Sequence, residues 1–165
     1  MELQTALPRG DQLFPVRRIL QADGTLLEPV PAFLSVDQLK DVYRKMVYLR
    51  VFDQRCLNLQ RQGRMGTFAP FSGQEASQVG SAYLLRPDRD WIFPTYRDHG
   101  AMHVMGVPLV NILRYFMGDE QGSHAPQGVN AFPISIPIAT QLLHAVGAAW
   151  AGKIKGEDTV AVGYA

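Results

Sequence analysis

The C-terminal part of the chain carries the pattern that most constrains its fold. Residues 139–152 read ATQLLHAVGAAWAG, a helical pattern whose alanines and glycines let a neighbouring backbone approach closely, so we expect a buried helix. Residues 159–164 read TVAVGY, which is typical of a parallel strand covered on both faces. A helix, a short loop and a buried strand predict an α/β fold. Because ligands bind beyond the carboxyl ends of parallel strands, residues 163–165 should reach such a site.

The longest predicted helix begins after Ser35. Ser35 and Gln38 have the spacing of a capping box, in which each side chain accepts a hydrogen bond from the other residue's backbone N–H. A mostly apolar stripe follows and ends at Gly63. Its members are Leu39, Val42, Tyr43, Met46, Leu49, Arg50, Phe52, Asp53, Cys56, Leu57 and Gln60. Cys56, the only cysteine, is expected to be a small core residue without a disulfide.

Proline and glycine residues divide the rest of the chain into shorter elements. The pattern predicts a loop over residues 67–73, a helix over 74–85, a buried strand over 91–93 and a helix from Pro108 to Gly118. Residues 1–34 contain several prolines and a turn at Ala22-Asp23-Gly24. They predict an extended N-terminal arm with at most a short hairpin, followed by a domain over residues 35–165.

Charge and composition exclude several classes of function. The chain has 16 Lys and Arg residues against 15 Asp and Glu residues, and this balance provides no field that would hold nucleic acid or an anionic membrane. No stretch approaches the roughly 18 uninterrupted apolar residues of a membrane span, and no secretion signal is present, so we expect a cytoplasmic protein. Phosphate-cradling glycine motifs, HExxH and cysteine pairs are missing, so the residues alone reveal no complete catalytic constellation.

Three segments occur in a distinctive order and spacing. They read QGRMGTFAPFSGQEASQVGSA from residue 62, PTYRDHG from residue 94 and GVNAFPISIPIATQLLHAVGAAWAGK from residue 128. This arrangement resembles the α subunits of bacterial pyruvate dehydrogenases, which are thiamine-diphosphate-dependent 2-oxoacid dehydrogenases, and the resemblance runs from about Phe14 to Ala165. It implies an incomplete thiamine-diphosphate-binding fold, a parallel sheet flanked by helices, of which residues 35–165 form the N-terminal part.

The resemblance implies a cofactor-binding role for four residues. In the family, the residues that match Tyr96 and Arg97 contact the cofactor's diphosphate, and a guanidinium with several N–H donors suits phosphate oxygens. The backbone at Ile136 and Ile138 is expected to face the aminopyrimidine and diphosphate of the cofactor. The alternative for Arg97 is a surface ion pair with Asp98 or Asp90, which is the usual fate of an arginine.

The resemblance also implies a potassium ion in the turn that begins at residue 135. The matching residues are Ser135, Pro137, Thr140 and Gln141, and their hydroxyl, carbonyl and amide oxygens are neutral ligands that suit a monovalent cation. The alternative is that Ser135 simply caps the N-terminus of the helix that follows.

Aromatic residues near these motifs receive different roles. The resemblance places Phe68 in the wall of the substrate pocket, and bulky side chains suit a pocket for an acid as small as pyruvate. Phe71 is expected in the core. His99, near Trp91 and Phe93, is expected to be a hydrogen-bonded structural residue and not a proton shuttle.

The family's remaining functional parts lie outside this sequence. Family members continue from the last strand into Gly-Asp-Gly and a later Asn, which bind Mg²⁺, so the magnesium ligands are expected beyond Ala165. A separate β subunit completes the site in an α2β2 assembly, and the acetyl group formed from pyruvate passes to the lipoyl arm of an acyltransferase component. This chain alone is therefore expected to be inactive.

Two other interpretations stay open. One is a branched-chain 2-oxoacid or acetoin dehydrogenase α subunit, although the loop from Phe68 to Ala76 favours pyruvate. The other is a truncated or split chain that binds no cofactor and serves only to dock a β subunit. Absence of the Gly-Asp-Gly motif favours that alternative.

Overall fold

The computed structural model describes residues 18–165, which divide between Leu39 and Lys40 into two compact units. In the first unit, α2 (Val36–Arg61) begins as predicted. Ser35 N donates to Gln38 Oε1 at 2.8 Å, and Gln38 N donates to Ser35 Oγ at 3.2 Å. The capping box is therefore confirmed, while the domain division after residue 34 stays a prediction.

The predicted turn in the N-terminal arm is also present. Gln21 N donates to Thr25 O at 2.9 Å, and Gly24 has a φ of 88°, a value that favours glycine. Leu20 and Leu26 form an antiparallel bridge across the turn. The short hairpin is thus confirmed, and the part of the arm over residues 1–17 lies outside the described residues.

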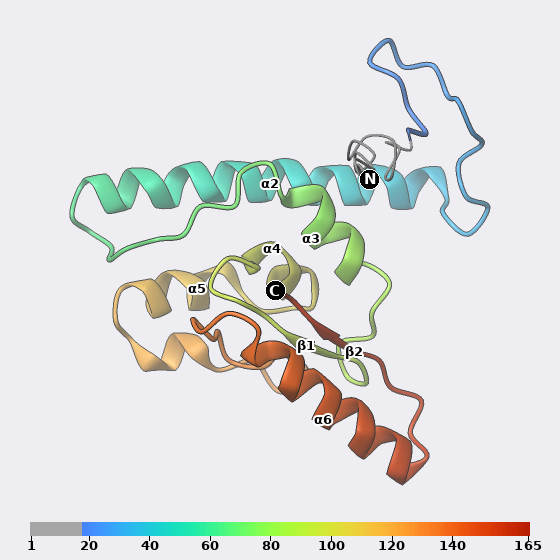
Figure 1. The fold of residues 1–165 in the computed structure, drawn as a ribbon. Coiled ribbons are helices and arrows are strands. Elements are labelled where there is room, and N and C mark those ends of the chain that lie inside the picture. Colours follow the sequence, from blue (N-terminus) through green and yellow to red (C-terminus); the bar gives the residue numbers. More distant parts are fainter. Residues whose placement is uncertain (1–17) are drawn as a thin grey trace, which may run out of the picture. The chain divides into compact units, whose positions relative to one another are not determined.

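Shorter helices and two strands make up the rest of the second unit (Figure 1). In chain order they are α3 (Glu75–Ala82), β1 (Trp91–Phe93), α4 (His99–Val104), α5 (Leu109–Phe116), the 3₁₀ helix η1 (Glu120–Ser123), α6 (Thr140–Lys155) and β2 (Ala161–Gly163). The predicted helix over 74–85 ends early, at Ala82, and the one from Pro108 ends at Phe116, before Gly118. In β1, Ile92 and Phe93 are buried as expected, whereas Trp91 is partly exposed.

The sheet is parallel, as predicted. Strand β2 pairs with β1 in parallel, with Ile92 opposite Val162. On the other side of β1, residues 131–135 run in the same direction through isolated bridges from Ile92 to Ala131 and from Thr95 to Ser135. Strand β1 therefore lies between two parallel neighbours, and their carboxyl ends share one edge.

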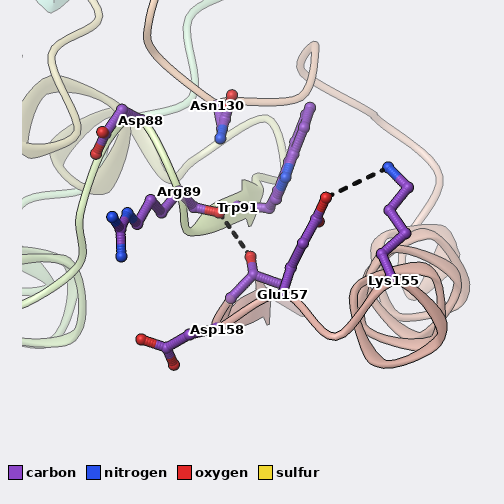
Figure 2. A pocket seen from close by; sticks show the side chains of 8 residues that line it. Asp88, Arg89, Trp91, Asn130, Lys155, Glu157 and Asp158 are labelled. Atoms are coloured by element: carbon purple, nitrogen blue, oxygen red, sulfur yellow. Dashed lines mark hydrogen bonds and ion pairs between the residues drawn. The ribbon is translucent and has the colours of Figure 1, made fainter.

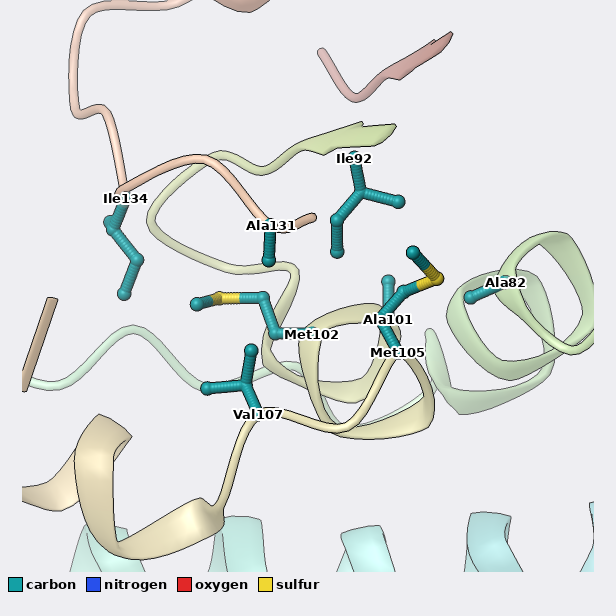
Figure 3. Packing of buried hydrophobic residues seen from close by; sticks show 8 residues of the cluster. All are labelled: Ala82, Ile92, Ala101, Met102, Met105, Val107, Ala131 and Ile134. Carbon is teal, nitrogen blue, oxygen red and sulfur yellow. The ribbon is translucent and has the colours of Figure 1, made fainter. Parts of the chain in front are cut away.

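Helices cover both faces of this sheet. On one face, Ile92 packs with residues of α3 and α4 (Figure 3). On the other face lies α6: a Cβ added to Gly163 would stand 3.0 Å from a methyl of Leu142 and 3.3 Å from the Cβ of Ala145. The α/β fold predicted from the sequence is therefore confirmed.

The prediction that helix α6 is buried is wrong. Only Gln141, Ala145 and Gly152 are buried, and other small residues of the helix, such as Gly147 and Ala149, are exposed. A Cβ at Gly152 would lie 2.3 Å from Thr159 Cγ2, so the expected close approach does occur there. The large apolar residues point away, and Leu143, Val146, Trp150 and Ile154 are 66–76% exposed. Within the described residues, no second layer covers that side of the helix.

At the amino ends of the strands, Asp90 connects β1 to the start of β2. Its carboxylate accepts hydrogen bonds from Arg86 N, Nε and Nη2 at 2.7, 3.0 and 2.8 Å, and from Val160 N at 2.9 Å. A charged cavity of about 420 Å³ lies beside this junction (Figure 2). In it, Lys155 and Glu157 form an ion pair at 3.6 Å.

Two hydrophobic clusters form the core of the second unit. The first joins the sheet to α3 and α4, and its buried members are Ala82, Ile92, Ala101, Met102, Met105, Val107, Ala131 and Ile134 (Figure 3). The second joins α2 to the following loop and to α3, and its buried members are Leu49, Cys56, Met65, Phe68, Phe71 and Val79. Burial raises the pKa of the Cys56 thiol to about 12, so this cysteine is an inert core residue, as predicted.

Candidate functional site

Three chain segments meet at the carboxyl edge of the sheet. Residues 94–98 follow β1, residues 135–138 follow the parallel segment beside it, and Tyr164 and Ala165 follow β2. Tyr164 N donates to Phe93 O at 3.1 Å, which keeps β2 alongside β1 to this edge. The predicted site residues of the first two segments therefore come together where parallel sheets bind ligands.

The turn that carries Tyr96 and Arg97 is fixed from within. The Asp98 carboxylate accepts hydrogen bonds from the backbone N–H of Thr95, at 2.8 Å, and from its hydroxyl. The same hydroxyl accepts from Arg97 N at 3.2 Å. Asp98 is buried and accepts both hydrogen bonds through Oδ2, so it acts as a part of the turn.

Arg97 is available for an anionic ligand. Its Nη1 donates to the carbonyl oxygen of Pro70, and its guanidinium lies over the Tyr96 ring at 5.5 Å from the centroid. No carboxylate among residues 18–165 forms an ion pair with it. The alternative of a pair with Asp98 or Asp90 is therefore wrong, because Thr95 engages the first and Arg86 and Val160 engage the second.

Tyr96 and Arg97 line two cavities of different character. One, of about 170 Å³, is polar and is lined by Gln74, Thr95, Tyr96, Arg97, Asp98, Ile138 and Ala165. The other, of about 430 Å³, is mostly apolar and is lined by Thr67, Phe68, Ala69, Pro70, Tyr96, Arg97, Phe116 and Ile136. The geometry thus places an arginine between a small polar space and a larger apolar one.

Helix α2 fixes the loop that supplies the apolar cavity with Phe68. Gln60 Oε1 accepts from Phe68 N at 2.8 Å, and Asp53 accepts from Phe71 N at 2.9 Å and from the Ser72 hydroxyl at 2.8 Å. Phe68 and Phe71 are both almost fully buried, so Phe71 is core as predicted. Sequence reasoning missed the roles of Gln60 and Asp53. Their signal was a polar residue within an otherwise apolar stripe.

Glu75 has a structural role at the start of α3. It pairs with Arg50 of α2 through both carboxylate oxygens and accepts from Gly73 N at 2.9 Å. The Arg50 guanidinium holds the pKa of Glu75 below its usual value, against the opposing effect of burial. Glu75 is therefore ionised and engaged, and it is not a candidate proton donor.

Gln78 of α3 holds the turn from the other side and was not predicted from the sequence. Its Nε2 donates to Arg97 O at 3.0 Å, and its Oε1 accepts from Gly100 N at 2.8 Å. A Cβ at Gly100 would lie 2.7 Å from Gln78 Oε1, so the two segments are in close contact. Gln78 thereby sets the backbone position of Arg97.

Replacing Gln78 with leucine is expected to lower the free energy of unfolding by about 1 to 2 kcal/mol, because the buried Gly100 N–H loses its acceptor. Urea unfolding followed by circular dichroism measures this change. Ser77→Ala, at an exposed neighbour on the same helix, is the control and should change stability by less than about 0.5 kcal/mol. Equal effects of the two substitutions would contradict the role given to Gln78.

The four residues predicted for potassium lie together in one turn. The hydroxyls of Ser135 and Thr140 are 3.0 Å apart, Thr140 Oγ1 donates to Pro137 O at 2.8 Å, and Gln141 Nε2 donates to Ser135 O at 2.8 Å. Gln141 Oε1 is buried without a hydrogen-bond partner among the described residues. The N-cap of α6 is Ala139, and no side chain caps it, so the alternative that Ser135 caps this helix is wrong.

His99 lies behind the apolar cavity, among rings other than those expected. Its ring stacks on Phe68 at 5.3 Å and meets Phe71 and Phe116 edge-on at 5.6 and 5.2 Å. Neither ring nitrogen finds a hydrogen-bond partner in residues 18–165, so the prediction of a hydrogen-bonded residue near Trp91 and Phe93 is wrong. Burial lowers the pKa of His99 to about 3, although the nearby Ala69 backbone partly opposes the shift. The imidazole is therefore neutral at physiological pH.

Among residues 18–165, no three or more His, Cys, Asp or Glu residues gather in a way that could hold a metal ion. In the same residues, no helix is both long and apolar enough to cross a membrane. The charged cavity of Figure 2 lies at the amino ends of the strands, away from the edge where parallel sheets bind ligands.

Comparison with known proteins agrees with this geometry. A family model described as dehydrogenase E1 component matches residues 43–165. The pyruvate dehydrogenase E1 component subunit alpha of Bacillus cereus is 40% identical over 152 residues, and those of Staphylococcus aureus and Staphylococcus epidermidis are 39% and 38% identical over the same length. These matches cover 92% of this chain and 41% of each relative, so the chain spans less than half the length of these curated relatives. The chain therefore belongs to the dehydrogenase E1 component family.

Proposed function

We propose that this chain is part of the α subunit of a cytoplasmic pyruvate dehydrogenase and that its sheet edge contributes to a thiamine diphosphate site. The observation that carries the proposal is the position of Tyr96 and Arg97, which line both the polar and the apolar cavity. In this arrangement one pair of residues faces a diphosphate on one side and a small 2-oxoacid on the other.

The residues at the polar cavity fit a diphosphate. Arg97 has no carboxylate partner in the described part of the chain, so its charge is free to neutralise phosphate oxygens. The Tyr96 hydroxyl has no hydrogen-bond partner among residues 18–165 and is free to donate to the same group. Ile136 and Ile138 are more than 60% exposed at this edge, so an added ligand would bury apolar surface there.

Each side chain then has a distinct role. Arg97 and Tyr96 would bind and orient the diphosphate, while the buried Phe68 would exclude water from the acid. When bound, thiamine diphosphate supplies the nucleophilic carbon and the electron sink that decarboxylation of a 2-oxoacid requires. The Mg²⁺ that accompanies the diphosphate would be held by residues that follow Ala165 in the family.

A potassium ion at the turn after residue 135 is a second part of the proposal. Ser135, Pro137, Thr140 and Gln141 bring hydroxyl, carbonyl and amide oxygens into one turn. The buried and unpartnered Gln141 Oε1 supports a cation there, because a buried acceptor without a donor is costly. The ion would keep Ile136 and Ile138 at the cofactor edge.

The proposed partners are a β subunit, in an α2β2 assembly, and the lipoyl arm of an acyltransferase that accepts the acetyl group. Exposed apolar side chains on α6 support a protein partner: Leu143 is 76% exposed and Ile154 is 73% exposed. The relatives are pyruvate dehydrogenase subunits, which favours pyruvate over branched-chain 2-oxoacids and acetoin.

Cofactor titration tests the proposal. The chain is assembled with a β subunit and with a polypeptide that carries Gly-Asp-Gly, and thiamine diphosphate is titrated calorimetrically in the presence of Mg²⁺. Arg97→Ala is expected to weaken binding by roughly 1.5 to 3 kcal/mol, the scale of a hydrogen bond to a charged group. Arg89→Ala, in the charged cavity at the opposite edge, is the control and should leave the affinity unchanged.

Two outcomes would overturn the proposal. If the complete assembly binds no thiamine diphosphate, the chain is a docking module and not part of a cofactor site. If Arg97→Ala and Arg89→Ala have the same affinity as the unsubstituted chain, the diphosphate does not bind at the carboxyl edge of the sheet.

A further inference from the structure

We infer that Phe116, at the C-terminal end of α5, forms the wall that limits the length of the 2-oxoacid side chain in the apolar cavity. This inference rests on the proposed function, and it assigns a specificity-determining role to a residue for which the sequence carried no motif. Phe116 lines the cavity of about 430 Å³ together with Phe68, Tyr96 and Arg97. A 2-oxoacid bound in this cavity would place its side chain against the aromatic part of the lining.

The backbone of Phe116 is fastened to the loop that carries Phe68. Gly66 N donates to Phe116 O at 2.9 Å. A Cβ at Gly66 would lie 2.8 Å from the same oxygen, so these two segments approach as closely as a glycine permits. The end of α5 and the start of the loop therefore form one fixed unit, and Phe116 is not a mobile residue at the rim of the cavity.

The side chain of Phe116 is held by other rings. It meets Phe68 edge-on at 5.2 Å and 76°, and it meets His99 edge-on at 5.2 Å and 83°. Such edge-to-face contacts stabilise the orientation of both rings beyond their area burial. His99, stacked on Phe68, thus supports both walls of the cavity from behind.

The neutral state of His99 suits this supporting role. The ring is fully buried, makes no hydrogen bond within residues 18–165 and is surrounded by Phe68, Phe71 and Phe116. A charged imidazolium would be unstable in such a setting. His99 therefore acts as a flat packing ring, and the walls it supports cannot retreat to accommodate a longer side chain without opening a gap in the core.

A rigid wall of this kind discriminates by size. One added methylene in a fixed apolar pocket changes the relative binding of two substrates by about 10-fold to 200-fold. Phe116 is suited to this task because it is half-buried and faces the cavity, whereas Phe71 is buried in the core. Shortening Phe116 would add space without removing Arg97 or Tyr96.

The test compares substrates in the assembly of this chain with its β subunit and the Gly-Asp-Gly polypeptide. Phe116→Ala and the milder Phe116→Leu are assayed for kcat/KM with pyruvate and with 3-methyl-2-oxobutanoate. We expect the kcat/KM for 3-methyl-2-oxobutanoate, divided by that for pyruvate, to rise by about 10-fold or more in Phe116→Ala and by less in Phe116→Leu. Met117→Ala is the matched control, because Met117 is the next residue, is largely exposed and does not line the cavity.

The outcomes separate the inference from the proposed function. An active Phe116→Ala assembly with an unchanged substrate ratio overturns the inference alone, and so does an equal rise in Met117→Ala. If the unsubstituted assembly turns over no 2-oxoacid at all, the proposed function fails and the inference fails with it. The melting curve shows whether Phe116→Ala still assembles. If it does not, the kcat/KM ratio of Phe116→Leu is used instead, and an unchanged ratio in that variant contradicts the inference.

Discussion

Replacing Asp90 with asparagine is expected to lower the free energy of unfolding by roughly 2 to 4 kcal/mol at pH 7. The Asp90 carboxylate is almost fully buried and accepts hydrogen bonds from three nitrogens of Arg86 and from Val160 N. Asparagine offers one acceptor oxygen in place of two. Its NH₂ group would face the N–H donors of Arg86 or Val160 instead of accepting from them. Because Arg86 and Val160 precede β1 and β2, the loss should loosen the pairing of the two strands.

The stability that Asp90 contributes depends on pH, because its carboxylate can be protonated. The Arg86 side chain holds the pKa of Asp90 well below its ordinary value of 3.8, and it outweighs the opposing effect of burial. A lowered pKa in the folded state contributes stability that is fully present above the ordinary value and is lost as the pH falls below it. The difference in unfolding free energy between the parent and Asp90→Asn should therefore be constant above about pH 5 and shrink below about pH 4.

Urea unfolding at pH 7, 5 and 3 measures both predictions. Asp88→Asn is the control, because Asp88 is an exposed carboxylate in the same loop, and its removal should change stability by less than about 0.5 kcal/mol. If the difference in unfolding free energy between the parent and Asp90→Asn stays constant down to pH 3, the ionised Asp90 carboxylate does not supply the predicted stability.

Features encoded by neighbouring residues could be predicted from the sequence. The capping box of Ser35 and Gln38, the turn at Gly24 and the strand around Ile92 each depend on a few adjacent side chains and on backbone preferences. The same holds for the helix that follows Pro108, because a proline at the start of a helix and a periodic apolar stripe are local signals.

Features that depend on distant contacts could not be predicted. Helix α4 has too few residues to show a periodic pattern, and its His99 packs against rings from the 67–73 loop and from α5. The prediction that α6 is buried was wrong, because composition does not reveal which face of a helix meets the sheet. Gln78 and Asp53 hydrogen-bond across 18 to 22 residues of sequence, so no spacing rule could have linked them to the turn and loop they hold.

The candidate site shows the same division. Tyr96, Arg97 and Phe68 were proposed from the resemblance. In the structure, Tyr96 and Arg97 follow β1 at the edge that three parallel segments share, and Phe68, from the loop after α2, lines one cavity with them. Phe116 entered the site only through the packing of α5, because nothing in its neighbours along the chain distinguishes it from a core residue. The resemblance suggested the residues of the proposed anion-binding side, and the packing was needed to suggest Phe116 as the proposed apolar wall.

Replacing Gly122 with alanine is expected to lower the free energy of unfolding by roughly 3 kcal/mol or more. Gly122 lies in η1, packed against α5, and an added Cβ would stand 2.3 Å from Tyr115 N and 2.4 Å from Asn111 O. Both are backbone atoms, so no rotamer change can relieve the overlap and α5 itself must shift. Because Phe116 is the last residue of α5, the same substitution should also disturb the apolar wall of the candidate substrate cavity.

Gly80→Ala provides the matched control for this prediction. Gly80 lies within α3, and the space around an added Cβ is open, so alanine there should stabilise the chain by about 0.5 to 1 kcal/mol through its higher helix propensity. Urea unfolding of the two variants should therefore give shifts of opposite sign. If both glycines tolerate alanine equally, α5 and η1 are not in close contact, and the rigid support proposed for Phe116 loses its structural basis.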